Sequence, residues 1–211
     1  MKNFYFTVIV CTYNRKKTIV KCIDSILNQT IDDLEIIVID DGSTDNTIKI
    51  LNSRYKNNIS FYKNITNKGL IFSRNKAIKL SSGNFISFVD SDDWILPNHF
   101  KIRKKILKKN NCDFVHGGFK VLGKNYVVDR FDETKKISLS DCIVDSTLIF
   151  KKKDLTNLGL FPNIDYGAGY DLYYNAKKKG LKCCEIEEKT YIYDRTNLNS
   201  ITNKKLENLI N

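Results

Sequence analysis

Short apolar runs alternate with helical patterns through the first half of the chain. Runs of strand length, rich in β-branched and aromatic residues, occupy 4–11, 35–40, 60–63 and 85–90. Between and after them, apolar residues recur at helical spacing over 18–27, about 43–53, 70–80 and about 97–107. Strands that alternate with helices in this way predict βαβ units and a parallel sheet.

The second half of the chain has a less regular pattern. It predicts strands over 112–121, 126–131, 145–150, 183–186 and 191–193, and one helix over 171–179 that ends at Gly180. We therefore expect antiparallel strands to join the parallel half in a mixed α/β sheet. No repeat or linker divides the chain, so we predict a single domain over 1–211 with halves at 1–110 and 111–211.

Polar residues follow each of the four predicted strands of the first half. The carboxyl ends of parallel strands share one edge of the sheet, and ligands bind at that edge in open α/β folds. A single acidic loop is usually a turn or a helix cap, whereas four polar loops at one edge predict a binding site. The four clusters are Thr12-Tyr13-Asn14-Arg15, Asp40-Asp41-Gly42-Ser43, Asn64 with Asn67-Lys68-Gly69, and Asp90-Ser91-Asp92-Asp93.

Asp90 and Asp92 lie two residues apart at the end of a hydrophobic strand, so their side chains are expected to point the same way. Two crowded carboxylates need a cation or protons. Their oxygens suit Mg²⁺ or Mn²⁺, and Mg²⁺ typically takes one or two carboxylates together with substrate phosphates. The alternative is an acidic turn that caps the next helix. The neighbouring polar loops favour the metal site.

The other polar positions each allow two interpretations. Asp40 could accept hydrogen bonds from a nucleobase or a ribose, or it could close a turn. The 12–14 segment offers a hydroxyl and an aromatic face for a nucleobase, or it is an ordinary loop at a strand end. Lys68 and Arg74 could bind phosphate or face solvent.

Charge and hydropathy narrow the setting of the protein. The net charge of +11 indicates either a well-solvated surface or an anionic partner, including peripheral contact with an anionic membrane. Aromatic and basic residues do not interleave as in nucleic-acid grooves, so no nucleic-acid partner is expected. No apolar run approaches the roughly 20 residues of a membrane span, and the N-terminus has a strand pattern. We therefore expect a cytoplasmic protein without a transmembrane segment.

Motifs that are missing from the sequence disfavour several classes of enzyme. No GxGxxG follows the first predicted strand and no GxxxxGK[ST] occurs, which disfavours dinucleotide oxidoreductases and P-loop enzymes. The two histidines have no recognisable triad setting, so a hydrolase has little support. The six cysteines include no CxxC, so a zinc site is disfavoured, and reduced thiols are expected.

Four ordered segments of the first 110 residues resemble family 2 glycosyltransferases. They are VIVCTYNR (8–15), VIDDGSTDNT (38–47), NKGLIFSRNKAI (67–78) and SGNFISFVDSDDW (82–94). Weaker similarity continues through 158–163, 170–180 and the end of the chain. The resemblance implies the GT-A fold, in which a Rossmann-like parallel half flanked by helices binds a nucleotide-sugar. A smaller antiparallel part, here 111–211, then binds the acceptor.

The resemblance implies an inverting, hexosyltransferase-like enzyme that uses a divalent metal, Mn²⁺ or Mg²⁺. Its donor would be a nucleotide-diphosphosugar, most often UDP-linked, and its acceptor a glycan, a lipid-linked group or a protein. Asp92 matches the residue that contacts the metal directly. The residues that match nucleotide-sugar contacts are Thr12, Tyr13, Asn14, Asp40, Lys68, Arg74, Asp90 and Ser91.

The sequence departs from the family where the general base is expected. That base is usually the Asp of a Glu-Asp pair just before an Asp-Leu that opens the late helix. Alignment on Asp171-Leu172 places Ala168-Gly169 at the pair. The base is then Asp171 or Asp165, or the chain is a catalytically silent nucleotide-sugar-binding module of a larger transferase. We favour Asp171, for which the alternative role is a helix N-cap.

Overall fold

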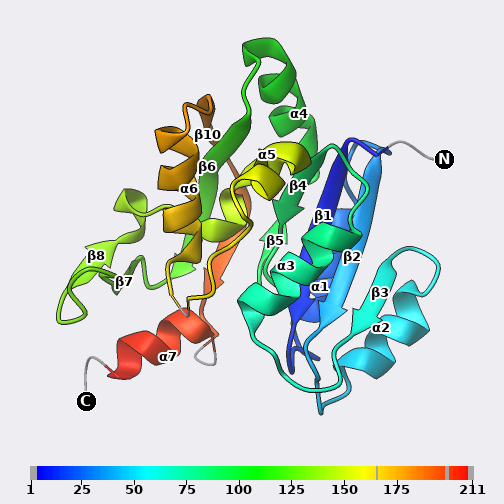
Figure 1. Ribbon diagram of the computed structural model, residues 1–211. Helices are drawn as coiled ribbons and strands as arrows, with labels where there is room; N and C mark the ends of the chain where they lie inside the picture. The colour runs from blue at the N-terminus through cyan, green and yellow to red at the C-terminus, as the bar shows by residue number, and fades with distance from the viewer. Residues whose placement is uncertain (1–3, 165, 198–199, 209–211) are drawn as a thin grey trace.

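In the computed structural model, which describes residues 4–164, 166–197 and 200–208, an eight-stranded sheet has the order β3-β2-β1-β4-β9-β6-β10-β5 (Figure 1). Two further short strands, β7 and β8, form a separate antiparallel pair. The strands are β1 Phe6–Thr12, β2 Leu34–Asp40, β3 Ser60–Lys63, β4 Phe85–Phe88, β5 Trp94–Ile95, β6 Phe114–Gly123, β7 Tyr126–Val128, β8 Lys136–Ser138, β9 Ile149–Lys151 and β10 Cys183–Arg195.

Strand direction brings most of the strand ends to one edge of the large sheet. Strands β1 to β4 are parallel. β9 is antiparallel to both β4 and β6, so β6 runs in the direction of β4, and β10 is parallel to β6. The carboxyl ends of β1 to β4 therefore share an edge with those of β6 and β10. The predicted mixed α/β sheet is confirmed.

Helices cover both faces of the sheet. The alternation of side chains along β1 sends Val8 and Val10 into one core and Ile9 into the other. α1, α2 and α4 pack against the first core, while α3, α5 and α6 pack against the second and lie in front of the sheet in Figure 1. The helices are α1 Ile19–Leu27, α2 Thr47–Tyr55, α3 Leu70–Leu80, α4 His99–Asn110, α5 Lys152–Asn157, α6 Ala168–Lys178 and α7 Ile201–Asn208.

The structure differs from the sequence prediction mainly in the second half. The two strands predicted over 183–186 and 191–193 are one strand, β10, interrupted by a register shift. The strand predicted over 145–150 divides into a 3₁₀ turn, Asp145–Thr147, and β9. Strands β5 and β8 are too short to give a hydrophobic period. None of the described helices is long and apolar enough to cross a membrane.

The expectation that the cysteines are reduced is wrong for one pair. Cys112, which follows α4, and Cys184 in β10 form a disulfide with Cα atoms 6.0 Å apart. The two residues are 72 positions apart in sequence, and the parallel pairing of β6 with β10 brings them together. Cys11, Cys22 and the remaining cysteines are free.

A buried polar cluster joins α4 to β10. His99 Nδ1 lies 3.0 Å from the Thr190 hydroxyl, to which Arg103 donates a hydrogen bond of 2.7 Å. Arg103 also donates to the Gly117 carbonyl at 3.0 Å. Burial, and then the charge of Arg103, lowers the pKa of His99 well below its usual value. Folding therefore favours the neutral imidazole.

This cluster predicts a loss of stability in acid. As pH falls through the unfolded pKa of about 6.5, the unfolded chain takes up a proton at residue 99 that the folded chain does not bind. The free energy of unfolding should then decrease by up to about 1.4 kcal/mol per pH unit. His99→Gln should remove much of this slope in urea titrations between about pH 7.5 and 5.

His116→Gln is the matched control, because burial lowers the pKa of His116 to a smaller extent. It should remove less of the slope. An unchanged slope in His99→Gln would contradict the prediction.

Candidate active site

A cavity of about 870 Å³ opens at the carboxyl edge of the sheet. All of the site residues predicted from the sequence line it except Asp40 and Asp171. Charged and polar side chains from the loops after β1 and β4 form part of its lining. The second half of the chain contributes both charged residues and apolar ones, among them Val127, Phe131, Ile143, Tyr166, Tyr170 and Ile201.

Hydrogen bonds join the loop after β1 to the loop after β2. Asn14, at φ 53°, donates its backbone N–H to the Ser43 hydroxyl at 2.9 Å and accepts the Thr44 N–H on its side chain at 2.8 Å. The Arg15 N–H donates to the Thr47 hydroxyl at 2.9 Å. These contacts hold Tyr13, whose side chain is exposed, and Arg15 at the cavity.

Of the two adjacent aspartates at the end of β2, Asp41 lines the cavity and Asp40 does not. Asp40 is fully buried, and its Oδ2 accepts the Ser43 N–H at 2.9 Å. Asp41 accepts the backbone N–H groups of Lys68 at 2.9 Å and Gly69 at 2.8 Å. Asp41 therefore shapes the loop that places Lys68 on the cavity wall. The sequence argument named Asp40 as the nucleotide contact, whereas Asp41 is the one of the two that lines the cavity.

Arg74 is almost fully buried and bridges two carboxylates. One terminal nitrogen lies 2.9 Å from Asp90 Oδ1, and the other lies 3.4 Å from Asp145 Oδ2. The guanidinium carbon is 5.3 Å from the ring centres of both Phe88 and Phe161. Burial by itself would lower the pKa of Arg74, but Asp90 and Asp145 raise it above its ordinary value. The side chain therefore stays charged.

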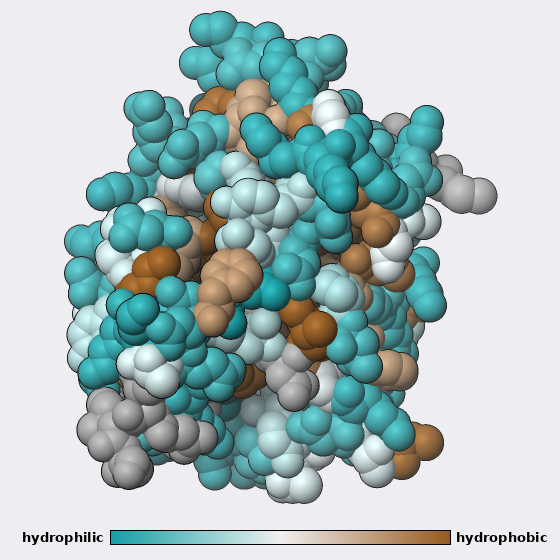
Figure 2. Space-filling model, turned by 60° about the vertical axis from the view of Figure 1, so that its left-hand side comes forward, coloured by the Kyte–Doolittle hydropathy of each residue, from teal (hydrophilic) through white to brown (hydrophobic). Residues whose placement is uncertain are grey.

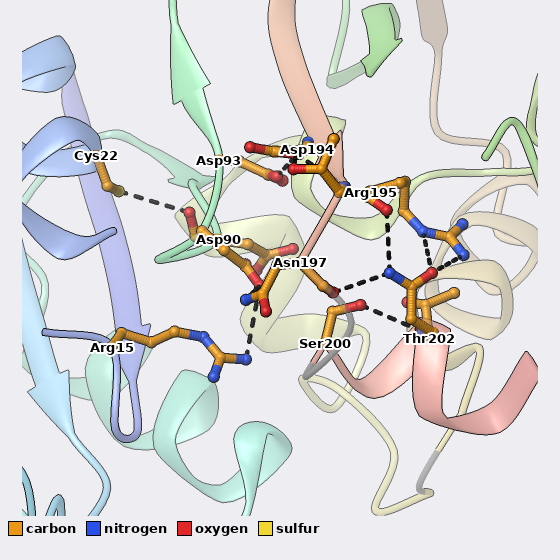
Figure 3. Close-up of polar contacts among 12 residues, drawn as sticks. Arg15, Cys22, Asp90, Asp93, Asp194, Arg195, Asn197, Ser200 and Thr202 are labelled. Carbon is orange, nitrogen blue, oxygen red and sulfur yellow. Dashed lines mark hydrogen bonds and ion pairs between the residues drawn. The ribbon is translucent and has the colours of Figure 1, made fainter. Parts of the chain in front are cut away.

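The aspartates of the loop after β4 have separate environments. Asp93 is buried, and it accepts hydrogen bonds from the Tyr191 hydroxyl at 2.6 Å and from the Asp194 N–H at 2.8 Å. Asp93 lies beside Asp194 of β10 in Figure 3. The Tyr191 hydroxyl also accepts the Asp90 N–H at 3.1 Å. Asp93 thus anchors the loop, and its neighbours are left to face the cavity.

Asp92 lies on the cavity wall beside Arg15. Its Oδ2 is 3.5 Å from an Arg15 guanidinium nitrogen, and 14% of its side chain is exposed. Burial, and then the charge of Asp90, raises the pKa of Asp92, while Arg15 lowers it. Ser91, between the two carboxylates, is buried and also lines the cavity. The negative charge at Asp90 and Asp92 is thus only partly offset.

The residue favoured as the base, Asp171, is paired with Arg130 and does not line the cavity. Its two carboxylate oxygens lie 2.9 and 3.1 Å from the two terminal nitrogens of Arg130. Arg130 also donates to the Gly167 carbonyl at 2.7 Å. Asp165, the alternative, lies outside the described residues. Asp145, which the sequence argument used only as the start of a strand, does line the cavity.

A sequence model described as Glycosyl transferase family 2 matches residues 7–174 of the chain. Two Escherichia coli proteins, WfgD and WfaP, are both described as UDP-Glc:alpha-D-GlcNAc-diphosphoundecaprenol beta-1,3-glucosyltransferases. WfgD is 33% identical over 77% of this chain and 66% of its own length. WfaP is 30% identical over 97% of this chain and 82% of its own length.

The fold is also similar to that of S. aureus TarS 1–349, solved in complex with UDP-GlcNAc. The TM-score is 0.75 at 24% identity, over 92% of this chain and 59% of that one. This chain therefore spans less than two thirds of TarS 1–349 and just under two thirds of WfgD. The structural likeness confirms the predicted GT-A fold.

The anchor of the aspartate loop yields a stability prediction. Tyr191→Phe leaves the buried Asp93 carboxylate without one of its donors, so the free energy of unfolding should fall by about 1–3 kcal/mol. Tyr193→Phe is the matched control, because the Tyr193 hydroxyl pairs with the neutral Thr202 hydroxyl at 3.2 Å. Its cost should be about 1 kcal/mol or less. Equal losses in urea titrations would count against an anchoring role for Tyr191.

Proposed function

The chain belongs to glycosyl transferase family 2, and on that premise we propose that it moves a sugar from a UDP-sugar to a lipid-linked glycan, with inversion at the anomeric carbon. The observation that carries this proposal is the cavity itself. Its lining presents Asp90, Asp92 and Arg15, which suit a charged donor, together with apolar side chains from the second half of the chain.

We place the nucleoside of the donor against the loops after β1 and β2. Within the described chain, Thr12 Oγ1 is buried without a hydrogen-bond partner, and Thr12 lines the cavity. An orphaned hydroxyl of this kind favours a ligand that completes its hydrogen bonding. Tyr13 offers an exposed ring for a base, and Asp41 orders the loop that carries Lys68 by accepting the Lys68 N–H. Asp40 supports this surface through Ser43.

The diphosphate of the donor fits between Lys68 and the carboxylates of Asp90 and Asp92. The unbalanced charge of these carboxylates suits a divalent cation, Mn²⁺ or Mg²⁺, held chiefly by Asp92. Phosphate oxygens usually complete the ligands of such an ion, so a cluster of protein carboxylates is not needed, and the described residues contain none of three or more groups. When bound, the ion would offset the charge that develops on the leaving diphosphate.

The apolar side chains of the cavity lining support the lipid-linked acceptor. Both E. coli relatives carry a name that specifies a diphosphoundecaprenol-linked acceptor. In this chain Phe131 and Ile201 are exposed at the cavity, with Arg130 and Lys204 also in its lining. Cations beside apolar side chains suit a diphosphate that carries a long hydrocarbon. Figure 2 shows apolar residues as separate patches in a mostly hydrophilic face.

Incubation with UDP-glucose and GlcNAc-α-diphosphoundecaprenol tests the proposed function. We expect Mn²⁺-dependent release of UDP and a disaccharide product with a β linkage, detected by mass spectrometry and NMR. If a panel of UDP-sugars binds but none is turned over on any acceptor, the chain is instead a nucleotide-sugar-binding module without catalytic activity.

The assignment of Asp92 yields a binding prediction. Asp92→Ala should weaken UDP affinity in the presence of Mn²⁺ by at least about 10-fold, because a carboxylate that holds the ion is removed. UDP affinity in EDTA should change little. Isothermal titration calorimetry measures both.

Asp141→Ala is the control for this measurement. Asp141 also lines the cavity, but it is exposed and lies in the second half of the chain. Its removal should leave UDP affinity unchanged. A normal Mn²⁺-dependent affinity in Asp92→Ala would refute the metal assignment.

A further inference from the structure

Asp145 is a carboxylate on the cavity wall that takes no part in the proposed donor binding. It begins the 3₁₀ turn before β9, and 27% of its side chain is exposed. Because the residue lines the cavity, this exposed part is within reach of a ligand there. The backbone N–H of Gly169, in the first turn of α6, donates a hydrogen bond to the carboxylate.

The carboxylate of Asp145 occupies the space that a side chain at position 169 would need. A Cβ built on Gly169 would overlap Asp145 Oδ1 and Cγ, and it would lie 2.9 Å from Asp145 Cβ. Gly169 is helical and has no positive φ, so its backbone does not require glycine. The lack of a side chain at 169 therefore makes room for Asp145. The carboxylate in this part of the cavity therefore belongs to residue 145, and residue 169 has no side chain that could supply one.

Arg74 fixes Asp145 next to the proposed donor site. One terminal nitrogen of the guanidinium pairs with Asp90 and the other pairs with Asp145. The same rigid group therefore holds both carboxylates. Asp90 belongs to the loop proposed to hold the donor. Asp171, in contrast, has both of its oxygens paired with Arg130 and is absent from the cavity wall.

We infer that Asp145 is the general base of the sugar transfer, an inference that rests on the proposed function. Its carboxylate takes the proton of the acceptor hydroxyl while that oxygen bonds to the anomeric carbon of the donor. The bond from this carbon to the diphosphate oxygen breaks, and its electron pair leaves with UDP. Asp145 then releases the proton to solvent. Gly169 and Arg74 are positioning residues for this carboxylate.

The electrostatic setting agrees with this role. Burial raises the pKa of Asp145, Arg74 lowers it, and Asp90 raises it, with a net increase above the usual value. Tyr166, from the segment that precedes α6, interacts with Asp145 as well. A carboxylate whose pKa is raised holds a proton more strongly, which makes it a better base near neutral pH.

Asp145→Asn tests the role while preserving the shape of the side chain. Binding of UDP-glucose with Mn²⁺ should be retained. Transfer, and the slower hydrolysis of UDP-glucose by water, should fall by at least about 100-fold. The wild-type transfer rate should fall at acidic pH as Asp145 takes up a proton. The residual rate of Asp145→Asn should not show this fall. Asp32→Asn, at an exposed aspartate outside the cavity, should retain wild-type binding and transfer.

Moving the carboxylate from position 145 to position 169 distinguishes a catalytic role of Asp145 from a purely structural one. Asp145→Gly should lose transfer, and the double variant Asp145→Gly with Gly169→Asp should recover at least about 10-fold of it, because the two side chains occupy the same space. Thermal melting and UDP-glucose binding confirm that each variant is folded. A folded double variant that binds the donor without recovered transfer counts against the assignment.

Two other outcomes overturn the assignment in distinguishable ways. Near wild-type transfer by Asp145→Asn, with loss of transfer in Asp171→Asn, moves the base to Asp171 and leaves the proposed function intact. A wild-type protein that binds UDP-glucose but neither transfers nor hydrolyses the sugar has no general base to assign. A wild-type protein that fails to bind any UDP-sugar instead contradicts the proposed function itself.

Discussion

The buried guanidinium of Arg74 is the contact on which the architecture of the site depends. It joins α3, the loop after β4 and the turn before β9 through two ion pairs, and it packs beside the rings of Phe88 and Phe161. A buried cation is stable only when its charge is matched, and the loss of one partner of a buried pair typically costs about 3–5 kcal/mol. The positions of Asp90 and Asp145 are therefore coupled to each other.

The aspartates of the site divide into those that build it and those left for a ligand. Asp40 and Asp41 satisfy backbone N–H groups in two neighbouring loops, and Asp93 accepts from Tyr191 and Asp194. Asp92 has longer contacts, with Arg15 and with the Asn197 amide, each at 3.5 Å. Because the structural aspartates already fix the loops, the remaining carboxylates are held in place before any ligand binds, which lowers the entropic cost of binding.

The departure from the family at Ala168-Gly169 has a physical counterpart in the structure. The glycine leaves a space in the first turn of α6, and a carboxylate from a different segment fills it. Asp171 is paired with Arg130 and does not line the cavity. The same region of the site can thus receive a carboxylate from position 145 or from position 169. A general base must have its oxygens in the right place, and the residue that carries them can differ.

The sequence by itself determined the parallel half, the edge at which the polar loops meet, and the family, because strand and helix periods and the spacing of motifs are local properties. It did not separate Asp40 from Asp41, two identical neighbours whose directions are set by the end of β2. It also did not pair Cys112 with Cys184 or bring Asp145 to Gly169. Only the tertiary structure decided these contacts, because they depend on the register of β9, β6 and β10, which residues far apart in the chain fix together.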